Sequence, residues 1–163
     1  VTIEPVAIGR GAGTVALKLN LDNPTVSTAS DDFVRAAAGA PGWEGQTWTR
    51  TIRVPLTTLD LLIARHGMPA FVKIDVEGFE AEVLAGLSRP AAALSFEFTT
   101  IQPDLAAACI DRCATLGYRR FNAALGESHA LAHPQWLSAP ELARWLAALP
   151  VAANSGDVYA VLD

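Results

Sequence analysis

Charged residues interrupt an otherwise apolar segment, FVKIDVEGFEAEVLAGL, at residues 71–87. Lys73 and Asp75 lie within what resembles a buried strand, and Glu77 and Glu80 follow where the pattern changes to that of a helix. Grouped carboxylates are costly to bury and repel one another, so they persist most readily where they orient a hydroxyl, accept a proton or hold a cation. The segment therefore predicts a general base, with a divalent cation held by the acids as an alternative.

A further acid, from the next predicted strand, belongs with this group. Glu97 lies in the next apolar run, ALSFEF at 93–98, and one helical stretch separates the two runs. Two such strands form a right-handed βαβ unit, and ligands of α/β sheets bind at the carboxyl ends of the strands. We therefore expect Asp75, Glu77 and Glu97 to meet at one edge of the sheet. Gly78 follows them, and its missing Cβ would let a ligand or the backbone come close.

A purely structural interpretation also fits these residues. Lys73 could simply pair with Asp75, and Glu77 could favour the N-terminus of the following helix through the helix dipole. Glu80 and Glu82 are expected on the solvated side of that helix. Residue spacing alone leaves both interpretations open.

The strands and helices that must position these residues are predicted from hydrophobic periodicity and from capping, glycine and proline residues at their ends. Strands are predicted at 2–8, 14–21, 51–56, 71–76, 93–98, 118–125 and 158–162. Helices are predicted at 31–39, 59–66, 78–87, 103–117 and 141–149. Because strands and helices alternate from about residue 51, we predict an α/β fold with a mainly parallel sheet, formed by a single domain over residues 1–163.

Local signals support several of these boundaries. Ser30 is predicted to cap the first helix, and Thr57 with Asp60 forms a capping box for the second. The glycine cluster GRGAG at 9–13 precedes a strand instead of a helix, so it predicts a hairpin turn and not a dinucleotide-binding loop.

Composition excludes several classes of protein. The net charge is −5, with 51% apolar and 18% charged residues, and no Lys/Arg run suggests a nucleic-acid or membrane partner. No apolar stretch reaches the length of a membrane span. Cys109 and Cys113 lie four residues apart on one predicted helix face, a poor geometry for a disulfide, and we expect two reduced core thiols. This pattern favours a cytoplasmic protein.

Weaker candidates lie towards the C-terminus. Glu127 and His129, in GESH at 126–129, form a turn that could line a substrate pocket. Asn154 and Asp157 precede the last strand, where turn chemistry explains them.

The segments VPLTTLDLLIARHG, FVKIDVEGFEAEVLAGL and ALSFEF together resemble the FkbM family of S-adenosylmethionine-dependent methyltransferases. The resemblance implies a Rossmann-like class I methyltransferase sheet whose last strand is antiparallel. It implies S-adenosyl-L-methionine as cofactor and O-methylation of a hydroxyl on a small-molecule or saccharide acceptor. It places Asp75 and Glu77 at the end of the fourth strand, facing the transferable methyl group, with Gly78 beside the cofactor and Glu97 and Lys73 tuning the site.

The chain departs from the family pattern at its start. The family's first strand ends in a D-x-G-A-N-x-G loop and its second strand ends in an acid, and neither occurs here. We therefore expect the chain to begin after those two strands, with 2–8 as the third strand and without its sheet partners. Most of the cofactor pocket would then be missing, and we expect weak or absent binding of the cofactor. Apolar sheet edges would then be exposed, which favours pairing of two copies of the chain.

Two other functions stay open at this point. The acids could serve a metal-dependent hydrolase or phosphotransferase, or the domain could be a non-catalytic Rossmann-like binding module. No particular residues are assigned as metal ligands.

Overall fold

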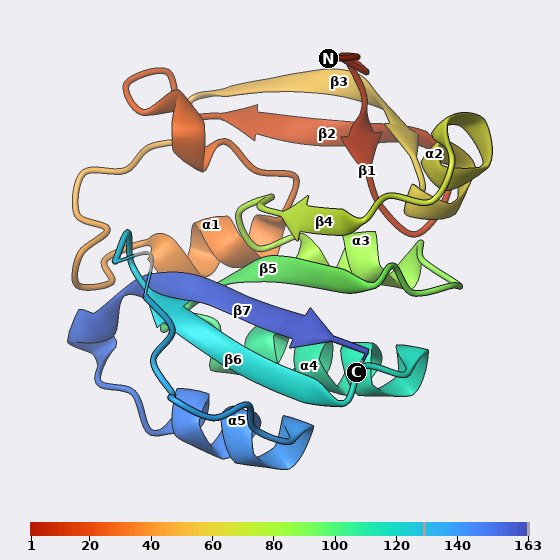
Figure 1. The fold of residues 1–163 in the computed structure, drawn as a ribbon. Helices are drawn as coiled ribbons and strands as arrows, with labels where there is room; N and C mark the ends of the chain where they lie inside the picture. The colour runs from red at the N-terminus through yellow and green to blue at the C-terminus, as the bar shows by residue number, and fades with distance from the viewer. Residues whose placement is uncertain (129, 163) are drawn as a thin grey trace.

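In the described part of the chain, seven strands form two separate sheets, and five α-helices pack beside them (Figure 1). The computed structural model describes residues 1–128 and 130–162. The strands are β1 (Ala7–Ile8), β2 (Gly13–Leu19), β3 (Arg50–Thr57), β4 (Phe71–Ile74), β5 (Ala93–Thr99), β6 (Arg120–Leu125) and β7 (Ser155–Val161). The helices are α1 (Asp31–Ala37), α2 (Leu59–His66), α3 (Glu80–Ala85), α4 (Pro103–Leu116) and α5 (Ala139–Ala147). Short 3₁₀ turns lie at Pro24–Val26 and Val151–Ala153.

The larger sheet, called here the second sheet, has the strand order β4-β5-β7-β6. Strands β4 and β5 are parallel neighbours, as predicted for a βαβ unit, and β7 runs antiparallel to both β5 and β6. The antiparallel last strand is therefore confirmed. This order places the ends of β4 and β5 side by side, where the charged residues follow.

The first sheet has the order β1-β3-β2, with β1 parallel and β2 antiparallel to β3. One mainly parallel sheet was therefore a wrong prediction, because the strands divide into two mixed sheets. The N-terminal strand is also shorter than predicted, but it does find a partner in β3. The turn at 9–13 is not a hairpin between paired strands, because β3 lies between β1 and β2.

The split leaves an edge of β4 without a strand partner among the described residues. Strand β1 pairs through only two residues, Ala7 and Ile8, and its other side is likewise unpaired in the described chain. Unpaired edges present N–H and C=O groups that can bind another strand. Pairing of two copies through such edges stays a prediction.

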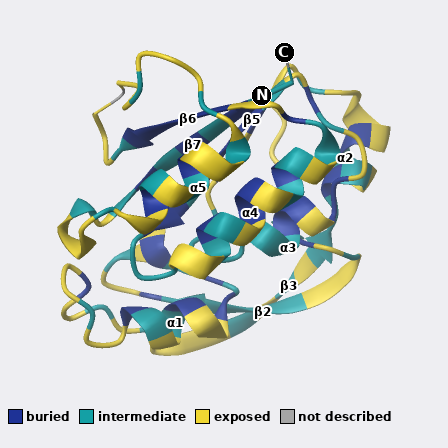
Figure 2. Cartoon of the chain, turned by 90° about the horizontal axis from the view of Figure 1, so that it is seen from below, coloured by how far each residue is buried: buried dark blue, intermediate teal, exposed yellow. Residues whose placement is uncertain are grey.

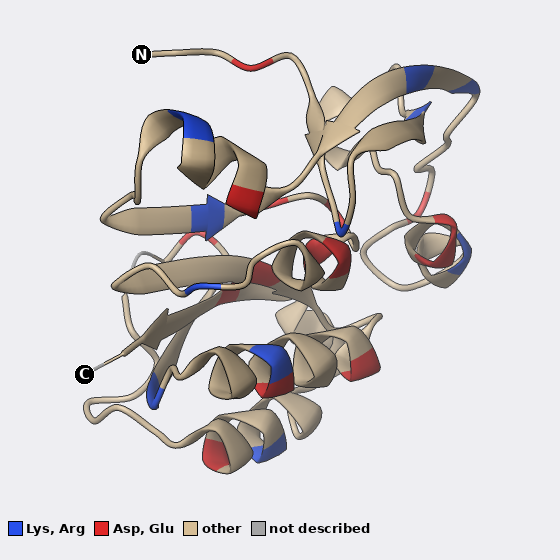
Figure 3. Cartoon of the chain, turned by 90° about the vertical axis from the view of Figure 1, so that its right-hand side faces the viewer, with Lys and Arg blue, Asp and Glu red and all other residues tan. Residues whose placement is uncertain are grey.

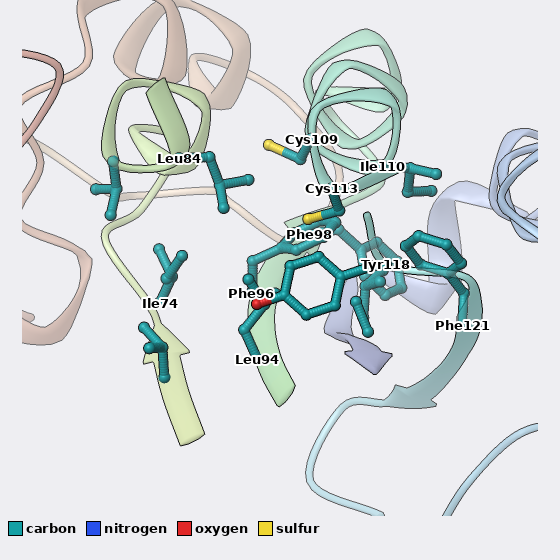
Figure 4. Packing of buried hydrophobic residues seen from close by; sticks show 14 of the residues in the cluster. Ile74, Leu84, Leu94, Phe96, Phe98, Cys109, Ile110, Cys113, Tyr118 and Phe121 are labelled. Carbon is teal, nitrogen blue, oxygen red and sulfur yellow. The ribbon is translucent and has the colours of Figure 1, made fainter. Parts of the chain in front are cut away.

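The main core lies between one face of the second sheet and the helices α3, α4 and α5 (Figure 2). Alternation along β4 and β5 directs Val72, Ile74, Leu94 and Phe96 into it. Figure 4 shows these strands packing against Leu84 and against the inward face of α4. The opposite face of this sheet carries the polar residues of the predicted site, and we refer to it as the open face.

Both cysteines lie on the inward face of α4 (Figure 4). Cys109 and Cys113 are fully buried and free, which confirms the predicted reduced thiols. Burial is the main cause that raises the pKa of the Cys113 thiol to about 12 and that of Cys109 still further. These thiols act as core side chains and not as nucleophiles.

Helix caps follow the local sequence closely. The Ser30 side chain accepts a hydrogen bond from Phe33 N, as predicted. The cap of α2 is Thr58, which accepts from Leu61 N, so the predicted capping residue was one position too early. The described helices include none with the length and hydropathy that crossing a bilayer requires.

Candidate functional site

The turn between β4 and α3 positions the carboxylates. Glu77 and Gly78 both have left-handed backbone conformations, with φ of 53° and 83°. Their consecutive positive φ values reverse the chain sharply after the strand, and the Glu77 carbonyl accepts a hydrogen bond of 2.6 Å from Thr28 Oγ1. A glutamate in this conformation is uncommon, because its Cβ crowds the backbone. The surrounding contacts therefore hold Glu77 in a backbone conformation that costs conformational free energy.

Three acids meet at the carboxyl ends of β4 and β5, as predicted. Ile74 pairs with Phe96 in the parallel register, so Asp75 and Glu97 follow side by side. One carboxylate oxygen each from Asp75, Glu77 and Glu97 lies within 4.8 Å of the others. Oε2 of Glu77 and Oε2 of Glu97 are buried and have no hydrogen-bond partner in the described chain. Such a group cannot be fully ionised without strong repulsion.

Burial is the main cause that raises the pKa of the Glu77 and Glu97 carboxyls. Desolvation, followed by the charges of Asp75 and Glu80, raises the pKa of Glu77 to about 7. Desolvation and the neighbouring acids raise the pKa of Glu97 to about 9, with Lys73 opposing this shift. At neutral pH, Glu97 is thus a neutral hydrogen-bond donor, and Glu77 changes between its acid and base forms.

Glu80 contradicts the prediction that it lies on the solvated side of its helix. Its side chain is only 2% exposed and accepts hydrogen bonds from Gly78 N at 3.1 Å and Val76 N at 3.4 Å. Burial raises its pKa, although these backbone donors oppose the change. The reason is that α3 begins at Glu80, so the carboxylate can fold back onto the preceding turn. Glu82, by contrast, is partly exposed and pairs with Arg10.

Lys73 supplies the positive charge of the site. Its ammonium lies 3.3 Å from Asp75 Oδ2 and also pairs with Asp157 on β7. Burial alone would lower the pKa of Lys73, but the hydrogen bond to Asp157 and the charges of both acids raise it overall. The lysine is therefore a permanent cation at neutral pH.

Asp157 was predicted as a turn residue, which is wrong, because β7 begins at Ser155. The alternation of VYAVL, extended by one residue towards the N-terminus, would have placed Asp157 on the same strand face as Tyr159. That signal was outweighed by the turn-forming residues NSGD.

The acidic cluster could in principle bind a cation, because carboxylate oxygens are hard ligands. Lys73 already places a positive charge beside Asp75, and the raised pKa values of Glu77 and Glu97 remove negative charge without a metal. The raised pKa values of Glu77 and Glu97 suit proton transfer by these carboxyls.

Two cavities flank the turn. The larger, of about 840 Å³, is lined by α1, the turn, and the first residues of α3 and α4, with Gly78, Arg35 and Gln102 on its wall. The smaller, of about 430 Å³, lies between the first sheet and the residues that follow β4, which include Asp75. Phe79 lines both. The turn thus separates two spaces of the size that small ligands occupy.

Glu127, one of the weaker candidates, lies away from the acidic cluster. Glu127 is exposed in the turn after β6, and other residues line the two cavities. His129 lies outside the described residues. A substrate-binding role for these two residues stays a prediction.

Lys and Arg residues are spread over separate elements (Figure 3).

The partly buried carboxyl of Glu97 predicts how stability should depend on pH. The folded-state pKa of Glu97 is raised above its unfolded value, so its contribution to stability is complete below about pH 4.5 and is lost as the pH rises through about 9. We expect the free energy of unfolding to fall over this range, and to fall less in Glu97→Gln, which does not ionise. Urea unfolding of both proteins across the range measures this, with the exposed Glu44→Gln as the matched control. An equal fall in all three proteins would contradict the prediction.

An α/β domain with acids at the carboxyl ends of parallel strands, flanked by two cavities, has the features of a small-molecule enzyme. The model of the Methyltransferase FkbM domain matches residues 2–149, so the chain belongs to the FkbM methyltransferase family. This confirms the resemblance seen in the sequence, and the family implies S-adenosylmethionine as the methyl donor. No curated protein and no solved structure matches the chain.

Proposed function

We propose that this methyltransferase transfers a methyl group to a hydroxyl of a small-molecule or saccharide acceptor. The observation that carries the proposal is the pair of partly buried carboxyls, Glu77 and Glu97, which meet Asp75 at the ends of β4 and β5. Asp75 lines the smaller cavity, and Gly78, the residue after Glu77, lines the larger one. Alcohols are poor nucleophiles until a base removes or orients the proton, and a carboxyl with a pKa near 7 suits that task.

The smaller cavity fits the methyl donor. Its wall is mostly apolar, from Val6, Ile8, Val54 and Phe79, and Asp75 supplies a carboxylate at one side. A purine ring favours such walls, and a sulfonium cation favours the neighbouring carboxylate. S-Adenosylmethionine supplies an electrophilic methyl group when bound. We assign Asp75 to the sulfonium side. Gly78, expected beside the cofactor, lines the larger cavity instead, and Phe33 and Gln102 fill the space beside its Cα.

The larger cavity fits the acceptor. It lies on the other side of the turn, and its polar wall includes Arg35, Gln102 and Asp104. Gln102 Oε1 has no hydrogen-bond partner in the described chain. The hydrogen-bond donors and acceptors on the wall of this cavity suit a ligand with several hydroxyl groups.

The carboxyls act on the acceptor proton in this proposal. Glu77, in its ionised form, accepts the proton of the hydroxyl or orients it towards the donor. Glu97, which is neutral at the same pH, donates a hydrogen bond within the cluster and prevents a second buried negative charge. Lys73 balances the charge of Asp75. Gathering these groups in one place reduces the cost of orienting them during the reaction.

The direct test is incubation of the full chain with methyl-deuterated S-adenosylmethionine and a panel of monosaccharides and hydroxylated small molecules. Mass spectrometry is expected to show addition of one deuterated methyl group, and NMR to place it on oxygen. Addition to nitrogen or carbon would sink the proposal. Phosphate-ester hydrolysis that needs added Mg²⁺ and no methyl donor would instead favour the metal-dependent alternative.

A further inference from the structure

The Lys73 side chain crosses the open face of the second sheet. In the strand register Lys73 lies opposite Ser95, and Ser95 lies opposite Tyr159. Ser95 is small and only 1% exposed, so the lysine can extend over β5. Its ammonium thereby reaches Asp157 on β7, two strands away from its own backbone.

Glu97 lies in the path of this lysine. It pairs in register with Asp157, so both side chains stand in one row on the open face. Yet the Lys73 ammonium is hydrogen-bonded to Asp157 and lies beside Asp75, while the buried Oε2 of Glu97 has no partner in the described chain. An ammonium donates hydrogen bonds only to acceptors that it contacts. Asp75 and Asp157 therefore compete with Glu97 for the Lys73 ammonium.

We propose that Asp157 is a positioning residue, which holds the Lys73 ammonium away from Glu97 and so leaves the Glu97 carboxyl available to the reaction. The consequence for rate rests on the proposed methyl transfer, whereas the geometric role does not. Without Asp157 the ammonium would keep Asp75 as one acceptor and would turn to Glu97, the partner of Asp157 in the strand register, as the second. Glu97 would then form an ion pair and lose its proton.

The charged groups that face Glu97 come from three sides. Strand β4 and the turn after it contribute Lys73, Asp75 and Glu77, and α3 contributes Glu80. Strand β7 contributes Asp157 in the same row. On the remaining sides, β6 places Ala124 in this row, and α4 contributes the apolar Leu105 and Ala106 to the small pocket beside Glu97. Lys73 is thus the cation whose position can decide the state of Glu97.

The test follows the Glu97 carboxyl directly, by ¹³C NMR titration of the full chain labelled at glutamate. Asp157→Asn is expected to lower the Glu97 titration midpoint by about one pH unit or more, a tenfold change in its protonation equilibrium. Asp157→Glu keeps the charge and is expected to hold the midpoint near that of the native chain. Asp111→Asn, on the exposed side of α4, is the control and should leave it unchanged.

A second background separates the lysine's movement from the simple loss of a negative charge. In Lys73→Met there is no ammonium to move, so adding Asp157→Asn should produce no comparable fall. An unchanged midpoint in Asp157→Asn, or an equal fall in both backgrounds, would overturn the proposal. Circular dichroism checks folding, and Asp157→Ser replaces Asp157→Asn if the latter does not fold.

Methyl transfer provides an independent readout. Asp157→Asn is expected to lower kcat about tenfold with little change in KM, and Asp157→Glu to restore most of the loss. If the NMR result holds while the chain transfers no methyl group, the proposed function fails and the positioning role stands. If Asp157→Glu is as slow as Asp157→Asn although Glu97 titrates normally in it, the catalytic consequence is wrong.

Discussion

Replacement of Glu77 by glutamine is expected to lower kcat by a factor of about 100 or more, the usual contribution of a general base. Glutamine keeps the size and the hydrogen-bond acceptor of Glu77 but cannot take up a proton at neutral pH. The native rate should rise with pH through about 7, because desolvation and the charges of Asp75 and Glu80 set the pKa of Glu77 there. Glu77→Gln should lose this rise. Initial rates of methyl transfer at several pH values measure both effects.

The control for this variant is Glu44→Gln, an exposed glutamate far from the cluster in the sequence. It should keep the native rate and pH profile. A Glu77→Gln protein that is folded, turns over at the native rate and keeps the same profile would remove Glu77 from the mechanism. A loss of rate with the native pH profile would instead indicate that Glu77 positions the acceptor and another group takes the proton.

Gly78→Ala is expected to have the largest effect on stability, a loss of about 3 kcal/mol or more. A Cβ at this position would lie 2.6 Å from both Phe33 Cβ and Gln102 Oε1, and 2.9 Å from Phe33 Cδ2. The backbone φ of 83° adds strain for any residue with a side chain. Urea unfolding of the variant and the native chain gives the difference in the free energy of unfolding.

Gly39→Ala separates the two causes. Gly39 has a similar φ of 76°, but a Cβ there would meet no atom within 4 Å. It should therefore lose only the backbone strain, about 1 kcal/mol. Equal losses in the two variants would mean that Phe33 and Gln102 move aside, and that the close packing of the turn against α1 contributes little.

Local structure was predictable where its cause is local. The α1 cap at Ser30, the α4 helix between Pro103 and Gly117, and the apolar alternation of β5 all follow from neighbouring residues. The meeting of Asp75, Glu77 and Glu97 was predictable as well, because a parallel βαβ unit forces the ends of its strands together. The family resemblance added the reaction class, which the acids alone leave open.

The remaining features depend on contacts between distant parts of the chain. Which strand edges pair is decided by tertiary packing, so the division into two sheets was not readable from β-strand patterns. The burial of Glu80 depends on the backbone amides of the turn, and the role of Asp157 depends on a lysine 84 positions away. The local pattern predicted a solvated helix position for Glu80 and a turn position for Asp157. Hydrogen bonds to the turn amides and to Lys73 instead decide where these two side chains lie.

The buried carboxylate of Glu80 has a consequence for how ligands bind. The amide groups of Val76 and Gly78 already have an anion supplied from within the chain. The turn therefore does not depend on an incoming phosphate or carboxylate to fix its shape, and these amides are not open to one. The turn should therefore be rigid before a ligand binds, and binding should cost little free energy for ordering this loop. We expect the site to select ligands by shape more than by charge.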